Sequence, residues 1–482
     1  MQKSVLAEFK GVALGDARRN ERARALVRVL AKDPPRSFPD SLGEGAELEG
    51  CYRLLGNDDV DEAALLAPHL EATRKRISKH KVVLAVHDTT EFRFSGPRDD
   101  LLPLQAGQLG HGFRSHCSLA VSSDGRREPL GLLALTSWAR EPKGRLGTQD
   151  RRADELRESK RWLAQSEAVE GAVGDVVSLI HVEDREADIY DSLSARVRDG
   201  VRFIVRAQTQ RLVVADEGFE NVGDFMRKQP RRFRRQVTLS PRPGSPSKKR
   251  EAKKVFEKTK TKRHSSNPPR DGRVVMLAFA AAEVTLCRPL ADRGCDDASI
   301  PPSLTLHAVH VLEEDPPEGE APVEWLLFTT EPIGTDEEIA FVVDSYRARW
   351  VIEEYFKALK TGCAYEERQL ESYGALQRAL SIFSVIAWRL LWMRFLAHHS
   401  PDAPASDLAS PTELTVLGAR GDCPADAKVA DFLRALATLG GHLRRNGPPG
   451  WQVLWRGHRK LALLVEGWSL ACAAVPKKCD QS

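Results

Sequence analysis

Two aspartates each follow a short apolar run that has the composition of a buried strand. Asp88 comes shortly after residues 82–86 (VVLAV), and Asp184 comes shortly after the strand-like residues 176–182. Functional groups of α/β proteins gather at the carboxyl ends of such strands, and carboxylates there suit a hard cation such as Mg²⁺. An aspartate in this position also commonly caps the next helix, so either residue taken alone has a structural explanation.

A predicted helix from Glu337 to Lys360 adds a third carboxylate in a chemically mixed setting. Its residues Tyr346, Arg349, Glu353 and Lys360 fall within an arc of about 60° when successive residues are placed about 100° apart. The apolar residues of the same stretch lie on the opposite side. A solvated face explains the charges, but it gives no reason for the tyrosine among them.

The spacing Tyr-x2-Arg-x3-Glu-x6-Lys resembles the Y-R-E-K signature of the Tn-five-like DDE transposases of the insertion-sequence-four group. The segments VVLAVHDTTEF, VEDREADI and RWVIEEYFKALKTG look like the three segments that carry the catalytic carboxylates of that family. The segments ALGDARRNERA, EGCYRLL and VEWLLFTTEPI are also similar, so the resemblance runs nearly from end to end. One departure is Phe356, which stands where the best-known member has a histidine.

The resemblance implies a catalytic triad of Asp88, Asp184 and Glu353 that binds two Mg²⁺ ions, for which Mn²⁺ would substitute. Two ions about 3.5 to 4 Å apart serve phosphoryl transfer by activating the attacking oxygen and stabilising the leaving one. It also implies DNA contacts, which we list as Tyr346, Arg349, Lys360, Lys357, Arg185, Arg206, the base-stacking Trp325 and, in the first long helix, Arg18, Arg19 and Arg22. Without the resemblance, Arg185 and Arg206 are explained equally well as surface ion pairs, and a core position is the favoured explanation of Trp325.

The function implied by this family is cut-and-paste transposition. Such an enzyme binds the inverted-repeat ends of a transposon, cleaves them through a hairpin intermediate and joins them to target DNA, acting as a homodimer. Two alternatives stay open. One is a general RNase H-like nuclease, which has no need of Tyr346 or Trp325; the other is a catalytically inactive DNA-binding descendant, against which the presence of all three carboxylates argues.

The elements that must position these residues predict an α/β fold with three parts. Residues 1–68 and 399–482 are each expected to be helical, and the resemblance implies that the first part binds DNA and the second forms the dimer. Between them, the pattern of residues 69–398 predicts a mixed sheet with flanking helices, which the resemblance implies is an RNase H-like catalytic domain. A β-rich insertion that carries a basic loop interrupts this domain at about residues 211–335.

The net charge of +4 hides an uneven distribution. The segment 227–273 holds 18 of the 72 Lys and Arg residues but only three of the 68 Asp and Glu, which leaves +15 there and −11 on the rest of the chain. We expect this basic segment and the arginine-rich helix at residues 16–32 to contact DNA phosphates. Acidic residues then dominate the remaining body, where the triad lies.

The other composition signals favour a cytoplasmic protein, and the resemblance implies a bacterial one that joins the nucleoid when it binds DNA. The longest apolar run, between Arg378 and Arg389, is shorter than the ~20 residues of a membrane span and predicts a buried helix. The first residues lack the apolar run of a secretory signal. The eight cysteines contain no Cys-x-x-Cys pair, which indicates reduced thiols and no zinc ribbon.

Overall fold

The computed structural model describes residues 5–95, 111–139, 158–208, 210–239, 241, 271–289, 300–318, 320–443, 445, 449 and 451–474. The chain divides into two compact units. The first unit combines Met1–Glu183 with Arg347–Ser482, and the second is Asp184–Tyr346.

The first unit begins with helices α1 (Val5–Glu8), α2 (Ala17–Leu30), α3 (Phe38–Leu42), α4 (Ala46–Leu55) and α5 (Glu62–Ile77). The long helix α2 begins after Asp16, whose carboxylate accepts hydrogen bonds from two backbone N–H groups of the first turn. Its apolar residues Ala23, Leu26, Val27 and Leu30 recur every three or four positions and are buried. The expected helical N-terminal region is therefore present.

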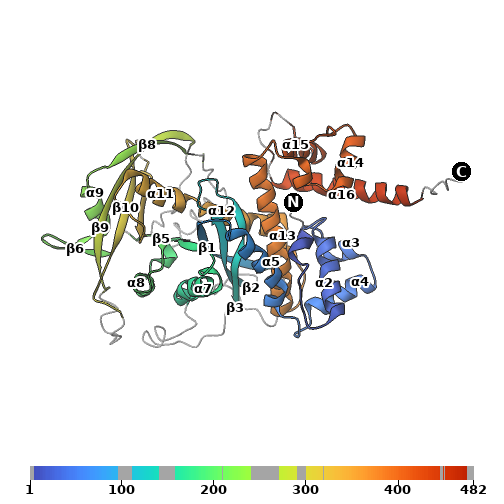
Figure 1. Cartoon of the computed structure of the whole chain (residues 1–482), viewed down its shortest axis with the longest axis horizontal. Coiled ribbons are helices and arrows are strands. Elements are labelled where there is room, and N and C mark those ends of the chain that lie inside the picture. Colours follow the sequence, from blue (N-terminus) through green and yellow to red (C-terminus); the bar gives the residue numbers. More distant parts are fainter. Residues whose placement is uncertain are drawn as a thin grey trace, which may run out of the picture. The chain divides into compact units, whose positions relative to one another are not determined.

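The sheet of the first unit has the strand order β3-β2-β1-β4. Strand β1 (Val82–Phe94) pairs antiparallel with β2 (His111–Ser122) and parallel with β4 (Ser178–Glu183), and β2 pairs antiparallel with β3 (Pro129–Ala139). Helix α7 (Glu158–Val173) covers one face, where its Val169 and Val173 join the core around Val83 and Ala85 of β1 (Figure 1). The mixed α/β class expected from the sequence is confirmed.

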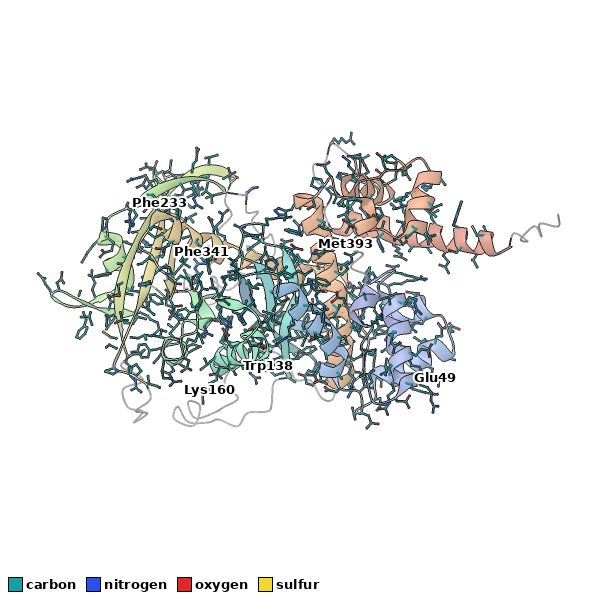
Figure 2. All side chains as sticks on the ribbon, viewed as in Figure 1. Glu49, Trp138, Lys160, Phe233, Phe341 and Met393 are labelled. Carbon is teal, nitrogen blue, oxygen red and sulfur yellow. The ribbon has the colours of Figure 1, made fainter. Side chains whose placement is uncertain are left out.

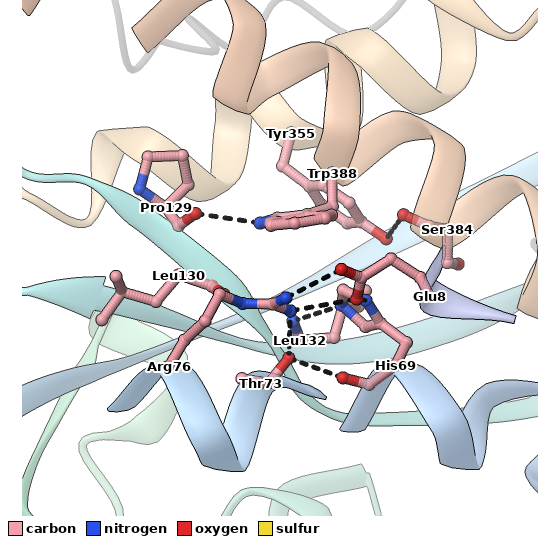
Figure 3. A network of polar contacts seen from close by, with 10 residues as sticks. All are labelled: Glu8, His69, Thr73, Arg76, Pro129, Leu130, Leu132, Tyr355, Ser384 and Trp388. Carbon is pink, nitrogen blue, oxygen red and sulfur yellow. Dashed lines mark hydrogen bonds and ion pairs between the residues drawn. The ribbon is translucent and has the colours of Figure 1, made fainter. Parts of the chain in front are cut away.

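Helix α13 (Tyr373–His399) is the long apolar helix of the first unit. It is long and apolar enough to cross a membrane, but 83% of its most apolar window is buried inside the protein, as in a core helix. Helix α12 (Trp350–Lys357), which carries Glu353, is tied to it, because the buried hydroxyl of Tyr355 donates to the backbone oxygen of Ser384 at 3.4 Å (Figure 3). The core helix therefore sets the position of the glutamate helix.

A buried polar network fixes helices α1 and α5 on the sheet (Figure 3). The Glu8 carboxylate lies 2.8 Å from Arg76 and 2.6 Å from Nδ1 of His69. Nε2 of His69 accepts the backbone N–H of Leu132 at 3.0 Å, so the single ring proton of a neutral imidazole sits on Nδ1 and is donated to Glu8. Burial lowers the pKa of His69, although Glu8 partly opposes the effect. The imidazole of His69 is therefore neutral in this network.

The rest of the first unit is helical. It comprises the π-helical turn η3 (Ala358–Gly362), the 3₁₀ turns η4 (Tyr365–Glu367) and η5 (Ala405–Asp407), and helices α14 (Pro411–Ala419), α15 (Val429–Leu439) and α16 (Trp451–Ala474). Glycines allow α15 and α16 to pack closely, since a Cβ at Gly457 would lie only 1.7 Å from the carbonyl oxygen of Leu436. Any side chain at residue 457 would therefore force the two helices apart.

The second unit is a β-rich body. It contains η1 (Arg185–Ala187), α8 (Tyr190–Arg198), β5 (Phe203–Arg206), β6 (Leu212–Ala215), β7 (Gly218–Asn221), α9 (Val222–Lys228), β8 (Phe233–Leu239), β9 (Arg273–Cys287), β10 (Ser303–Glu314), β11 (Glu324–Thr329) and α11 (Asp336–Arg347). Its strands run in the order β5-β11-β10-β9-β6-β7, and β8 also pairs with β9. Phe233 lies on β8 (Figure 2). Its ring stacks on that of Phe279 of β9, with ring centres 4.5 Å apart. This body contains the expected β-rich insertion.

The single helix predicted from Glu337 to Lys360 is wrong. Helix α11 ends at Arg347, α12 begins at Trp350, and the last residues form the π-helical turn η3. No Pro or Gly stands at the break. Ala348 is buried and the side chain of Arg349 bonds to Asp88 of β1, so tertiary contacts override the local helix preference. The four residues of the motif therefore do not share one continuous helix face.

Candidate active site

Asp88 lies within a strand rather than at its end. Strand β1 continues to Phe94 along β2, but the parallel pairing with β4 stops at Val86 and Val182. The carboxylate of Asp88 therefore lies just beyond the point where the neighbouring strand ends. Because the strand continues after Asp88 and no helix begins there, Asp88 is not a helix cap.

The carboxylates of Asp88 and Glu353 both form ion pairs with the side chain of Arg349. The guanidinium of Arg349 lies 3.0 Å from Oδ2 of Asp88 and 2.5 Å from Oε1 of Glu353. The three side chains remain partly in contact with water, at 16% exposure for Arg349, 18% for Asp88 and 32% for Glu353. Two carboxylates that converge on one positive charge are suited to a hard cation, which prefers oxygen ligands. Asp88 and Glu353 thus bring two carboxylates together around one positively charged group.

Asp184 is the first residue after strand β4. It stands two residues beyond Val182, as Asp88 stands two residues beyond Val86, the partner of Val182 in the register. Oδ1 of Asp184 accepts the backbone N–H of Glu186 at 2.8 Å and caps the short helix η1. The capping role considered from the sequence is thus present, and it uses one of the two carboxylate oxygens.

Lys360 and Lys357, both expected to contact DNA, differ in their surroundings. Nζ of Lys360 donates to the backbone oxygen of Glu91 at 2.5 Å and lies 5.4 Å from the ring centre of Phe92. Burial lowers the pKa of Lys360, while the nearby carboxylate of Glu366 acts in the opposite direction. Lys357 is 52% exposed and pairs with Glu354 at 2.8 Å. Lys357 is thus the more accessible of the two ammonium groups.

Tyr346 and Trp325 form an aromatic pair within the second unit. Their ring centres are 5.7 Å apart at an interplanar angle of 69°. Tyr346 is only 5% exposed, whereas Trp325 is partly exposed on β11. The tyrosine expected to contact a phosphate therefore packs against the tryptophan expected to stack on a base.

The remaining arginines from the sequence analysis belong to η1, β5 and α2. Arg185 is exposed on η1, and Arg206 at the end of β5 donates to the backbone oxygen of Glu324 at 3.5 Å. On α2, Arg18 and Arg22 are exposed one turn apart, while Arg19 pairs with Asp59 at 2.7 Å. Arg18 and Arg22 are therefore the accessible cations of the three predicted there.

The basic segment 227–273 is partly neutralised by its surroundings. Each of its described basic residues has a carboxylate or histidine partner in the second unit: Arg227, Lys228, Arg231, Arg232, Arg234, Arg235 and Arg273. The pKa of Glu324, one of these partners, falls to about 2, chiefly through its hydrogen bond to His310, against the effect of burial and with help from Arg227. The other 11 Lys and Arg residues belong to residues 242–270, which lie outside the described residues. The sequence thus overstates the charge that the described strands β8 and β9 offer to DNA.

A buried polar cluster beside the two aspartates was missed in the sequence analysis. His87 precedes Asp88, and His181 and Glu183 precede Asp184; all three are fully buried. The signal was available, because polar residues interrupt the apolar runs of both strands just before the aspartates.

Two parts of the chain match known protein families. Residues 1–60 match the family described as transposase DNA-binding, and residues 178–389 match the transposase DDE domain. A cryo-EM structure of a piggyBac transposase synaptic complex with hairpin DNA aligns over 96% of this chain and 74% of that chain, at 9% identity and a TM-score of 0.34.

The two family matches together span more than half of the chain, and the second contains Asp184 and Glu353. They agree with the RNase H-like α/β fold class and with a catalytic domain that uses divalent metal ions. The chain therefore belongs to the transposases that join an N-terminal DNA-binding domain to a DDE catalytic domain.

Proposed function

We propose that this transposase moves DNA by a cut-and-paste route and belongs to the Tn-five-like group. It would bind the inverted-repeat ends of a transposon, cleave them through a hairpin and transfer the 3′ ends to target DNA in the bacterial cytoplasm. The observation that carries the proposal is the convergence of Asp88 and Glu353 on Arg349, together with Asp184 at the matching position after the parallel strand.

The proposed ligands of the catalytic ions are the carboxylates of Asp88, Asp184 and Glu353. Their donor chemistry fits Mg²⁺, since all are oxygen ligands, and Mn²⁺ accepts the same set. When bound, two such ions supply Lewis acidity at the attacking and leaving oxygens of the phosphodiester. Arg349 would leave the carboxylates and pair with a DNA phosphate, where its planar group can form two parallel hydrogen bonds.

Trp325 and Tyr346 would serve the hairpin step. Trp325 is partly exposed, and Tyr346 supports it from the side. An unpaired base that stacks on an aromatic ring gains roughly 1 to 3 kcal/mol, which favours the extruded nucleotide needed for a hairpin. Arg18 and Arg22 of α2 would contact the phosphates of the inverted repeat. A homodimer, joined through the C-terminal helices, would hold two ends together.

The test uses the purified full chain, Mg²⁺ and a linear DNA fragment that carries the inverted repeats flanking its gene. We expect double-strand breaks at the repeat ends, hairpin-ended fragments, and at least ~10³-fold slower cleavage by the Glu353→Gln variant, the loss of several kcal/mol of transition-state stabilisation. Glu354→Gln, one residue away and paired to Lys357 and Arg394, is the matched control and should cleave normally.

The alternative functions give different results in this assay. Cleavage of any DNA regardless of its ends would indicate a general nuclease. Specific binding of the repeats without cleavage, unchanged by Asp88→Asn, would indicate an inactive descendant. Cleavage at the ends without hairpins would reject the role of Trp325.

A further inference from the structure

The first unit contains a second group of potential metal ligands, formed by His87 of β1 and by His181 and Glu183 of β4. Their ligand atoms all lie within 4.8 Å of one another, and each side chain is 0% exposed. Because side chains alternate along a strand, His87 points to the face opposite Asp88, the same face as Val83 and Ala85. The group therefore lies between the sheet and helix α7, on the face of the sheet opposite Asp88.

Hydrogen bonds define where the protons of the two imidazoles lie. Nε2 of His181 is 3.0 Å from Oε1 of Glu170, and an ionised carboxylate only accepts, so Nε2 carries the proton and Nδ1 presents a lone pair. Nε2 of His87 lies 2.8 Å from Nδ1 of His181 and therefore donates its proton to that nitrogen. Nδ1 of His87 then accepts the hydroxyl of Ser118 at 2.8 Å. A single proton thus occupies the space between the two rings.

This space has the chemistry of a zinc site. Two imidazoles and one carboxylate are a common zinc ligand set, which leaves one tetrahedral position to water. With Zn–N distances of about 2.05 Å the two nitrogens would stand about 3.3 Å apart, so the rings need to separate by only about 0.5 Å. The proton of His87 would move to Nδ1 and be donated to Oγ of Ser118, whose own hydroxyl proton would rotate away from the ring, so no proton needs to leave the protein.

The groups around the three side chains support the same conclusion. Metal-bound histidines usually donate their second N–H to an oxygen acceptor such as a carboxylate, a backbone carbonyl or water, which orients the ring. Glu170 is placed to do this for His181, and Ser118 for His87. The hydroxyl of Ser166 also lies 3.2 Å from Oε1 of Glu183, a contact that it shares with the backbone oxygen of Trp162 at 2.9 Å. These contacts are already formed without an ion.

We propose that His87, His181 and Glu183 bind one Zn²⁺ ion per chain, separate from the catalytic ions. The ion would tie β1 to β4 on the α7 side of the sheet. Mg²⁺ does not compete well for two nitrogen ligands, so the site would be selective against the ion proposed for catalysis. The proposal is independent of the proposed transposition route.

The experiment titrates the full-length protein, stripped of metal by a chelator, with Zn²⁺ in excess Mg²⁺ and without DNA. We expect one Zn²⁺ per chain by elemental analysis, and with Co²⁺ the visible absorption of tetrahedral cobalt. The ion should be lost in His181→Gln and bound roughly 10 to 100-fold more weakly in Glu170→Gln. It should be retained in Glu353→Gln, which alters the catalytic carboxylates.

The matched control is His310→Gln, because His310 is also a buried histidine bonded to a glutamate, Glu324, but lies in the second unit. It should keep the ion. X-ray absorption of the wild-type protein, which does not depend on any variant folding, should show two imidazole ligands. No Zn²⁺ bound in excess Mg²⁺, binding that survives His181→Gln, loss of the ion with Glu353→Gln, or a spectrum without imidazole scattering would each overturn the proposal.

Discussion

Replacing Arg349 by glutamine should tighten Mg²⁺ binding and at the same time slow DNA cleavage. In the chain without DNA, the guanidinium bridges Asp88 and Glu353 at 3.0 and 2.5 Å, so any Mg²⁺ that uses these carboxylates must compete with it. In the presence of DNA, the same guanidinium is proposed to hold a phosphate. The two effects of one substitution therefore have opposite signs.

The magnitude follows from the two charge-assisted hydrogen bonds that Mg²⁺ must break. Each is worth about 1.5 to 3 kcal/mol when well buried. Because the carboxylates of Asp88 and Glu353 are 18% and 32% exposed, water screens both, and we take about 2 kcal/mol for the pair. The Arg349→Gln variant should then bind Mg²⁺ up to about 30-fold more tightly than the wild type.

The assay is calorimetric titration of the DNA-free protein with Mg²⁺, and the thermal midpoint with and without Mg²⁺ gives a second readout. Without its counter-ion the carboxylate pair repels itself, so the midpoint of the metal-free variant should fall and its rise on adding Mg²⁺ should exceed that of the wild type. Lys357→Gln is the matched control, since it removes one positive charge from the same helix at an exposed position. An Arg349→Gln variant that binds Mg²⁺ no more tightly than Lys357→Gln would refute the competition.

Three other predictions test separate parts of the chain. Asp184→Asn should abolish cleavage of repeat ends while leaving their binding intact in gel-shift assays, whereas Glu186→Gln, two residues further on and exposed, should cleave normally. Deleting residues 242–270, which hold 11 Lys and Arg against two Asp and Glu, should make the logarithm of non-specific DNA affinity fall less steeply with salt, by about 0.9 for each lost phosphate contact; an unchanged slope would show that this segment does not touch DNA. Finally, burial lowers the pKa of His69, so the folded state binds fewer protons than the unfolded state, and stability in urea should be lost as the pH falls below about 6.5. His69→Gln, which can make the same two hydrogen bonds without titrating, should remove this dependence.

The fold class could be predicted from the sequence because it depends on local patterns. Apolar runs of strand length followed by amphipathic helices predict an α/β sheet, and α2, β1, β4 and α13 lie close to where these patterns expect them. The ends of the strands and helices could be predicted less well. Strand β1 extends eight residues beyond the apolar run that ends at Val86, since pairing with β2 supports polar residues that show no strand pattern of their own.

The candidate site could be predicted as a set of residues but not as a geometry. The sequence motifs single out Asp88, Asp184 and Glu353, whose catalytic roles stay a prediction. The helix break before Trp350 could not be read from the sequence, because no Pro or Gly marks it. Nor could the burial of Tyr346 against Trp325, since both residues suit either a core or a nucleic-acid surface.

By itself the sequence determined which carboxylates, cations and aromatics are available, where the net charge is concentrated, and the α/β class, since all of these depend on residue types and short-range periodicity. Only the tertiary structure decided which charges face one another. Arg349 meets Asp88 across 261 positions of the chain, and the basic residues of β8 meet acidic partners on other elements. Side-chain pairing over such distances depends on how the sheet and helices pack. For that reason the described basic residues of β8 and β9, which the sequence predicted to contact DNA, form ion pairs with acidic residues of the protein itself.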